Sequence, residues 1–387
     1  MSGPLAGTRV VEMAGLGPGP FAAMMLADMG ADVVRVDRAV RRTGDVYHAQ
    51  RDEADPRRYV MHRGRRSIGV DLTQADGVEV VLQLTDRADV LIEGFRPGVM
   101  ERRGLGPDVV TARNPRIVYT RITGWGQEGP LARTAGHDID YIAVAGALAN
   151  FARPGERPVA PLAMVGDMGG GGMLAAFGIV CALHEASRSG QGQVVDAAMV
   201  DGVAALGAMW HGMLAQGRWT ESRGNNFTDP GAPHYDVYET SDGRYVAVGA
   251  LEDPFWNELL DVLEIPADGL PPRTDPESWP RVQAALAAAF AQRTRDEWAD
   301  RFADTDACVA PVLGFSEAAR HPHLVARGTY VTEHGVVQAR PAPRFSRTDA
   351  ALSSRPPSPG EHTDQVLSEI GFDTAAIVRV RGEGAVG

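Results

Sequence analysis

Two ionisable side chains, each next to a glycine, are the first candidates for chemistry in this sequence. His137 stands in Gly-His-Asp-Ile-Asp-Tyr (136–141), and Asp167 stands in Gly-Asp-Met-Gly-Gly-Gly-Gly (166–172). An imidazole and a carboxylate on either side of a carbon acid can remove a proton from one face and return one to the other. The pair therefore indicates proton transfer at carbon, although a single His or Asp more often serves as a surface or capping residue.

The residues after Asp167 predict how its carboxylate is positioned. An apolar run over 173–187 is long enough for a buried helix, and four glycines connect it to Asp167. Asp167 would then lie at the N-terminus of that helix, where free backbone N–H groups can receive a developing negative charge. Because glycine carries no side chain, we expect these amides to be open to a ligand and to form an oxyanion site.

Arginine supplies every basic side chain of the protein. All 38 basic residues are arginine, since the sequence contains no lysine. This excludes the lysine Schiff base of pyridoxal phosphate enzymes and the lysine of the Walker A motif. Arginine suits phosphate recognition, because its guanidinium can donate two parallel hydrogen bonds to one phosphate.

The charge is unevenly distributed along the chain. Residues 1–121 carry 18 arginines against 16 acidic residues, whereas the rest carries 20 against 34. A net charge of −12 argues against a nucleic-acid partner. The slightly basic N-terminal part fits a small polyphosphate ligand, and it fits ordinary surface charge equally well.

Targeting and redox signals are sparse. The N-terminus has no charged segment followed by an apolar one, and we see no uninterrupted apolar run long enough to span a bilayer. We therefore expect a cytoplasmic protein without a membrane span. Two cysteines, Cys181 and Cys308, do not make a disulfide framework, and we expect each to be a small core residue.

Strands and helices alternate over the first half of the chain. Short apolar runs typical of strands, and the helical segments between them, occupy 8–13, 21–29, 32–36, 67–72, 77–87, 89–93 and 115–122. This order predicts a doubly wound parallel sheet, whose ligands bind beyond the carboxyl ends of the strands.

The glycines at 15, 17 and 19 invite comparison with a dinucleotide-binding turn. Their spacing differs from that fingerprint, and Pro18 and Pro20 lack the backbone N–H groups that would hold a pyrophosphate. We expect a tight strand-to-helix turn there instead.

The sequence changes character after residue 216. Residues 217–233 are rich in Gly, Asn, Asp and Pro and predict a linker. Two apolar runs joined by Ser-Asp-Gly (241–243) predict a β-hairpin, and further helices follow it. We expect a large Rossmann-like α/β domain over 1–216, to which 330–387 returns, and a smaller α+β domain over 234–329.

Motifs along nearly the whole chain resemble those of the α-methylacyl-CoA racemases, in the larger family that also holds the class III CoA-transferases. They include Val-Val-Glu-Met-Ala-Gly-Leu-Gly-Pro-Gly-Pro-Phe (10–21), Gly-Phe-Arg-Pro-Gly-Val (94–99), Thr-Gly-Trp-Gly-Gln (123–127), Gly-His-Asp-Ile-Asp-Tyr (136–141), Gly-Gln-Val-Val-Asp-Ala-Ala-Met-Val-Asp-Gly (192–202) and Asp-Ala-Cys-Val-Ala-Pro-Val-Leu (306–313). So many matches in the same order make the resemblance specific.

This resemblance implies an enzyme of fatty acid metabolism that interconverts (2R)- and (2S)-2-methylacyl-CoA thioesters by proton transfer through an enolate. It implies an interlocked homodimer, with the active site between the large domain of one chain and the small domain of the other. It implies no metal and no cofactor, because coenzyme A is part of the branched-chain acyl-CoA substrate.

The resemblance also assigns roles to individual residues. His137 and Asp167 would be the acid–base pair on opposite faces of the enolate, and Glu252 would orient the histidine. The CoA thioester would be bound by Arg38, Val70, Asp71, Leu72, Thr73, Gly94, Phe95, Arg96, Arg102, Gly136, Asp138, Ile139, Asp140 and Tyr141. Thr73 departs from the family pattern, which usually has a lysine there, so one phosphate or adenine contact differs.

Other interpretations stay open at this point. A CoA-transferase of the same fold would use Asp167 as a nucleophile and form an acyl anhydride. The Gly-His-Asp motif, and the lack of a second glycine loop near 225–260, favour the racemase. A non-catalytic acyl-CoA-binding protein would keep the arginines without needing His137 and Asp167 together. Met209 and Met213, beside Trp210, either line a track for the acyl tail or pack in the core.

Overall fold

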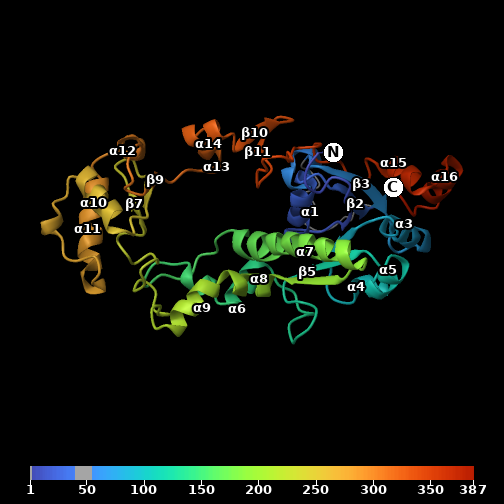
Figure 1. Ribbon diagram of the computed structural model, residues 1–387, viewed down its shortest axis with the longest axis horizontal. Helices are drawn as coiled ribbons and strands as arrows, with labels where there is room; N and C mark the ends of the chain where they lie inside the picture. Colours follow the sequence, from blue (N-terminus) through green and yellow to red (C-terminus); the bar gives the residue numbers. More distant parts are fainter. Residues whose placement is uncertain (1, 40–54) are drawn as a thin grey trace. The chain divides into compact units, whose positions relative to one another are not determined.

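The computed structural model describes residues 2–39 and 55–387, and the chain forms two compact units (Figure 1). Unit 1 comprises Met1–Ala145, Pro161–Leu206 and His323–Gly387. Unit 2 comprises Gly146–Ala160 and Gly207–Pro322. The domain boundaries expected from the sequence, 1–216 with 330–387 and 234–329, stay a prediction.

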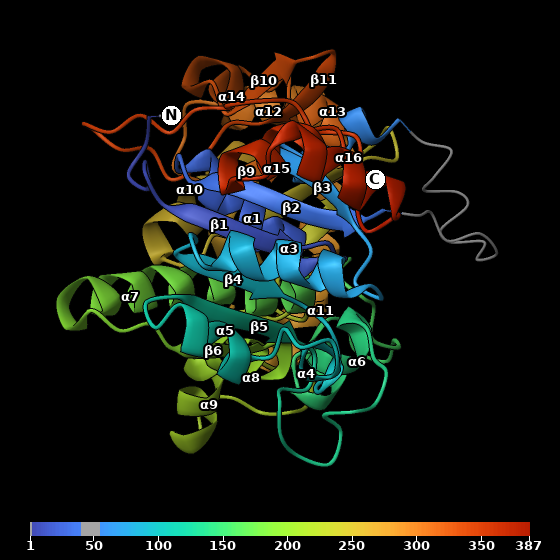
Figure 2. The ribbon, with the colours of Figure 1, turned by 90° about the vertical axis from the view of Figure 1, so that its right-hand side faces the viewer.

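Unit 1 is built on a six-stranded parallel sheet (Figure 2). Its strands are β1 (Arg9–Met13), β2 (Asp32–Arg38), β3 (Arg65–Val70), β4 (Val90–Glu93), β5 (Val118–Thr123) and β6 (Val194–Ala198). Their order is β3-β2-β1-β4-β5-β6, so the chain winds outward from β1 to one edge and then from β4 to the other. The doubly wound parallel sheet predicted from the sequence is confirmed.

Helices cover both faces of this sheet. They are α1 (Pro18–Asp28), α3 (Ala75–Thr85), α5 (Pro107–Arg113), α7 (Leu174–Ser189), α15 (Thr363–Ile370) and α16 (Thr374–Gly382). Helices α1 and α7 share a core with Val10, Val33 and Val118. Helices α3, α5, α15 and α16 share the other core with Val11 and Val34, the next residues along the same strands. The alternation follows the pleat of the strands, and the C-terminal segment completes the second core.

Unit 2 has its own core around a three-stranded antiparallel sheet. The sheet order is β7-β8-β9, and the elements are β7 (Asp236–Glu239), β8 (Tyr245–Val248), β9 (Val309–Pro311), α10 (Asp253–Val262), α11 (Trp279–Phe290) and α12 (Arg295–Phe302). Tyr238 stacks on Phe290, with ring centroids 5.3 Å apart. Strands β7 and β8 pair as a hairpin, in agreement with the sequence interpretation.

Shorter elements complete the two units. They are α4 (Val99–Arg102), α6 (Asp138–Val144), α8 (Met199–Leu206), α9 (Ala208–Ala215), α13 (Phe315–Ala318), α14 (Pro322–Arg327), β10 (Tyr330–Glu333) and β11 (Val336–Ala339). Gly207 separates helix α8 from helix α9. Strands β10 and β11 pair as an antiparallel hairpin.

Helix α7 buries one side against the sheet and exposes apolar residues on the other. Ala175 and Ile179 are buried, whereas the Phe177 side chain is 68% exposed. Cys181 lies on the same exposed side, four residues after Phe177, and Cys308 in unit 2 is exposed too. The expectation that both cysteines are core residues is therefore wrong.

One helical segment of the described chain, Met164–Ser189, is long and apolar enough to cross a bilayer by length and composition alone. The apolar run over 173–187 within this segment was expected to form a buried helix. Such a test is also passed by core helices, and α7 within this segment packs on β5, β6 and α1.

Candidate active site

Asp167 lies in the first turn of η4 (Met164–Met173), a π-helical segment that leads directly into α7. π-helical turns are rare and often occur at functional sites. The four glycines therefore lie within a helical segment, whereas the sequence interpretation had placed them ahead of one. Gly172 is buried against α1, and a β-carbon on it would stand 2.6 Å from Cδ1 of Phe21. Close packing explains these glycines, and the expectation of an open row of amide donors is wrong.

A hydrogen bond joins the loop that carries His137 to the helical segment that carries Asp167. His137 immediately precedes α6, and its backbone N–H donates to Oδ2 of Asp140 at 2.9 Å, as in an N-terminal cap. Its neighbour Asp138 is 8% exposed, and Oδ1 of Asp138 accepts the backbone N–H of Asp167 at 2.7 Å. The fold thus brings together two motifs that lie 30 residues apart in the sequence.

The environment of Asp167 suits a group that exchanges protons. The pKa of its carboxyl is raised to about 6, chiefly by burial and also by the Asp138 carboxylate, while His137 opposes the shift. A carboxyl with a pKa near neutral can act as acid in one direction and as base in the other. His137 is exposed, so its ring is accessible to a ligand.

Gly17 forms a wall of this site. It follows β1, precedes α1 and has a φ of +63°, which favours glycine. A β-carbon at Gly17 would stand 2.6 Å from Oδ2 of Asp167. The sequence interpretation assigned this glycine only to a turn. Its position after the central strand of a doubly wound sheet is the signal that could have identified it.

Tyr141 fixes the His137 loop from inside. Its hydroxyl donates to the carbonyl of Gly136, and its ring meets Trp125 edge-on at 4.9 Å. Gly124 is required beneath the ring, because a β-carbon there would stand 2.0 Å from it. Burial, and then the charge of Asp167, raise the pKa of Tyr141 to about 12, so its hydroxyl keeps its proton near neutral pH.

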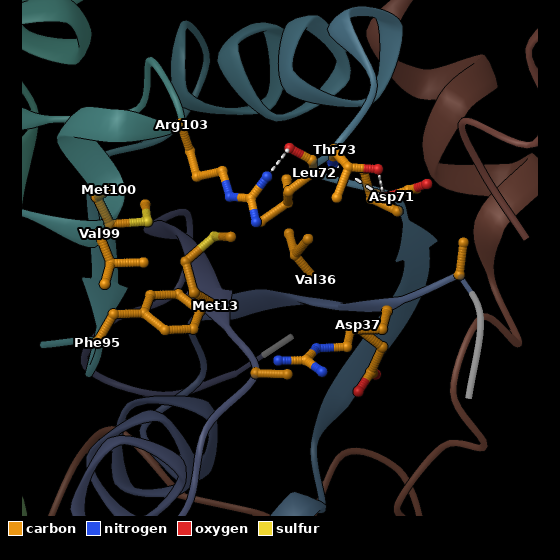
Figure 3. A pocket seen from close by; sticks show the side chains of 14 residues that line it. Met13, Val36, Asp37, Asp71, Leu72, Thr73, Phe95, Val99, Met100 and Arg103 are labelled. Atoms are coloured by element: carbon orange, nitrogen blue, oxygen red, sulfur yellow. Dashed lines mark hydrogen bonds between the residues drawn. The ribbon is translucent and has the colours of Figure 1, made fainter. Parts of the chain in front are cut away.

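A cavity of about 450 Å³ lies at the carboxyl ends of the strands (Figure 3). It is lined by Met13, Ala14, Val36, Asp37, Arg38, Ala39, Val70, Asp71, Leu72, Thr73, Phe95, Val99, Met100 and Arg103. The predicted contacts Arg38, Phe95 and 70–73 meet here, although they come from three parts of the chain. The predicted residues Gly94, Arg96, Arg102 and 136–141 do not line this cavity.

The two arginines that follow one another at the end of α4 differ in placement. Arg103 lines the cavity. Arg102 turns back over Gly98, where its Nη1 lies 3.0 Å from the position of a β-carbon. The sequence interpretation named Arg102 and missed Arg103, because a sequence does not show which of two adjacent side chains turns inward.

Glu252 belongs to unit 2, where it precedes α10. Burial, and then the charge of Glu252, raise the pKa of the Cys308 thiol. Cys308 in turn lines a largely apolar cavity of about 650 Å³ within unit 2, together with Phe151, Tyr235 and Val237.

The apolar residues of α9 are not part of a core. Helix α9 has no buried residue, and the side chains of Met209 and Trp210 are 56% and 40% exposed. The core-packing alternative for these residues is therefore wrong. Their predicted role as a track for an acyl tail stays a prediction.

The residues around Asp167 offer acid–base chemistry. Within 2–39 and 55–387, no three His, Cys, Asp or Glu side chains are grouped so that they could hold a metal ion. His137, Asp138 and Asp167 are instead arranged as one imidazole and two carboxylates, of which Asp138 is engaged by a backbone N–H. The expectation that the protein needs no cofactor stays a prediction.

Known proteins resemble this chain along nearly its whole length. Its residues 5–363 match the family described as CoA-transferase family III. The chain belongs to that family. Two relatives named alpha-methylacyl-CoA racemase, from Mus musculus and Homo sapiens, are each 44% identical over 381 residues, which cover 98% of this chain and 96% of each relative. The family resemblance predicted from the sequence is confirmed.

A solved structure supports the fold of this family III chain. The crystal structure of a CAIB/BAIF family protein from Brucella suis superimposes with a TM-score of 0.81. The two chains are 27% identical, and the match covers 96% of this chain and 100% of the other. The α/β architecture of unit 1 is therefore that of a known family.

Proposed function

We propose that this protein is a racemase that interconverts (2R)- and (2S)-2-methylacyl-CoA thioesters. The observation that carries the proposal is the hydrogen bond from Asp167 N–H to Asp138, because it ties the His137 loop to the Asp167 carboxyl. Two relatives that share 44% of its residues bear the name of such an enzyme, which supports the same reaction. Glu252 keeps its predicted role, the orientation of the histidine, as part of this proposal.

The reaction needs one base and one acid. The base removes the α-proton, and the C–H electron pair moves into an enolate whose oxygen takes up the negative charge. The acid then delivers a proton to the opposite face, so one proton leaves the substrate and one is added. Asp167, whose pKa is raised to about 6, serves as base for one epimer and as acid for the other, and His137 takes the complementary part.

The nucleotide part of the thioester occupies the 450 Å³ cavity of unit 1. Its apolar walls suit an adenine ring, and Arg38 supplies positive charge at its rim. Asp37 does not oppose this, because its carboxylate is paired with Arg35 and accepts the Ser67 hydroxyl at 2.6 Å. No metal and no further cofactor takes part, and the proposal places the enzyme in the cytoplasm.

The enzyme acts as an interlocked homodimer. The outward side of α7 exposes Phe177 and Val180, and Met173 and Leu206 nearby are also about half exposed. Contiguous exposed apolar surface commonly marks a protein interface. A second copy of this chain is the partner that the family resemblance implies.

Deuterium uptake tests the proposal. Either epimer of a 2-methylacyl-CoA, incubated with the protein in D₂O, should gain deuterium at C2 and approach a nearly equal mixture of epimers. A CoA-transferase would instead move CoA to a second carboxylic acid and leave the α-proton in place. Transfer without deuterium uptake, or binding with neither reaction, would refute the racemase assignment.

A further inference from the structure

Thr73 has no hydrogen left for a phosphate. Its hydroxyl donates to Oδ1 of Asp71 at 2.7 Å, and its backbone N–H donates to the same oxygen at 2.9 Å. A threonine hydroxyl carries a single hydrogen, so both donors of the residue are used. The cation that a lysine would provide at this position of the cavity is therefore missing.

Arg103 reaches the same place from the opposite wall of the cavity. In Figure 3 its guanidinium extends from the end of α4 toward Leu72, the residue before Thr73. Nη1 of Arg103 donates to the Leu72 carbonyl at 3.3 Å. This contact holds the guanidinium beside the backbone where the missing cation would stand.

Toward the described residues, Arg103 uses little of its hydrogen-bonding capacity. A guanidinium has five N–H donors, and the Leu72 carbonyl takes only one of them. None of the ion pairs between described residues includes Arg103. The Thr73 hydrogen bonds chiefly lower the pKa of Asp71, and the charge of Arg103 adds to this, but the two Asp71 oxygens already accept hydrogen bonds from Thr73 and Gln74. The remaining donors suit the bidentate recognition of a phosphate.

The surroundings of Arg103 favour a flat ligand that ends in a phosphate. Met13, Phe95 and Met100 give the cavity apolar walls (Figure 3). Among the described lining residues, the buried acid Asp37 is neutralised by Arg35. These described residues therefore offer an apolar interior and the cations Arg38 and Arg103.

We propose that Arg103 is a phosphate anchor for the CoA nucleotide and replaces the cation that Thr73 lacks. This inference rests on the proposed function, which makes a CoA thioester the ligand of this cavity. The phosphate is either the 3′-phosphate of the ribose or the pyrophosphate, because both belong to the same nucleotide and present the same chemistry to a guanidinium.

Calorimetric titration with free CoA and with 3′-dephospho-CoA tests this role. Arg103→Ala should weaken CoA binding about tenfold, as expected for a charge-assisted hydrogen bond at an accessible site. Arg103→Ala combined with Thr73→Lys should restore most of the affinity, because the cation returns from the other wall. Arg116→Ala is the matched control, since this exposed arginine precedes β5 and so lies at the amino end of a strand, whereas the cavity lies at the carboxyl ends.

Each outcome decides the proposal. A loss for CoA alone supports an anchor for the 3′-phosphate, and an equal loss for both ligands supports an anchor for the pyrophosphate. If Arg103→Ala binds both ligands as tightly as the unmodified protein does, the proposal is overturned. If the alanine variant does not fold, Arg103→Gln serves for the same test. Binding of free CoA does not require racemisation. The calorimetric test of Arg103 and the deuterium test of the proposed function can therefore succeed or fail independently of each other.

Discussion

The carboxylate of Asp167 lies against the backbone of Gly17, so that a β-carbon on Gly17 would stand 2.6 Å from Oδ2. Gly17 belongs to the turn between β1 and α1, and Asp167 belongs to η4. The turn after the central strand therefore sets the position of the group to which we assign proton transfer. Any side chain at residue 17 must displace that carboxylate.

Replacing Gly17 by alanine should lower kcat by about 100-fold, the typical effect of a displacement of about 1 Å in a catalytic group. The KM for acyl-CoA should change little, because the nucleotide cavity is not lined by this residue. Gly19→Ala is the matched control, since it lies in the same segment and a β-carbon there meets nothing within 4 Å. Equal kcat values for Gly17→Ala and Gly19→Ala in steady-state kinetics would refute the proposed effect of Gly17 on the position of Asp167.

Asp138→Asn should lower the pKa of Asp167. The negative charge of Asp138 raises that pKa, so a neutral amide removes the repulsion, while its Oδ1 can still accept the Asp167 N–H. For the epimer that Asp167 deprotonates, kcat/KM should rise through about pH 6 in the unmodified enzyme and through a lower pH in the variant. If kcat/KM of the variant rises at the same pH as that of the unmodified enzyme, or at a higher pH, this coupling is contradicted.

Asp167→Asn should make the protein more stable above pH 6 than the unmodified protein. The folded-state pKa of Asp167 is about 6 and its ordinary value is 3.8, so the folded state holds the proton more tightly. This tighter proton binding stabilises the folded protein fully at a pH below the ordinary pKa of Asp167. The stabilisation is lost as the pH rises through the folded-state pKa. Urea denaturation of both proteins at pH 4 and pH 8 measures the free energy of unfolding. An equal gain in stability for Asp167→Asn at both pH values would contradict this prediction.

Phe177→Glu should convert the dimer to monomers, because it places a charge in the apolar surface of α7. Light scattering should report half the mass of the unmodified protein. Val109→Glu is the control, since Val109 is exposed on α5, which covers the other face of the sheet. A variant that stays dimeric, or an unmodified protein that is a fully active monomer, would contradict the proposed assembly.

Features encoded by local patterns could be predicted from the sequence. The alternation of apolar runs with helical segments predicted a doubly wound parallel sheet, and the Ser-Asp-Gly turn predicted the β7–β8 hairpin. The motifs around His137 and Asp167 identified two groups that the fold brings into one electrostatic environment.

Features that depend on tertiary approach could not be predicted in this way. The role of Gly17 is set by a helical segment that lies about 150 residues later. The glycines after Asp167 were assigned to open amides, because a sequence does not reveal that α1 and α8 pack on them. Arg102 and Arg103 are identical in type and adjacent, so only the geometry of α4 distinguishes them.

The proposed division of labour between His137 and Asp167 is tested most directly by deuterium wash-in with His137→Ala and Asp167→Ala. Each epimer is incubated separately in D₂O, and exchange at C2 and inversion are followed by NMR and chiral analysis. Both variants should lose epimerisation, and each should still exchange the α-proton of one epimer, with the two variants acting on opposite epimers. Exchange of the same epimer by both variants, or epimerisation at the unmodified rate by either, would contradict two bases on opposite faces of the enolate.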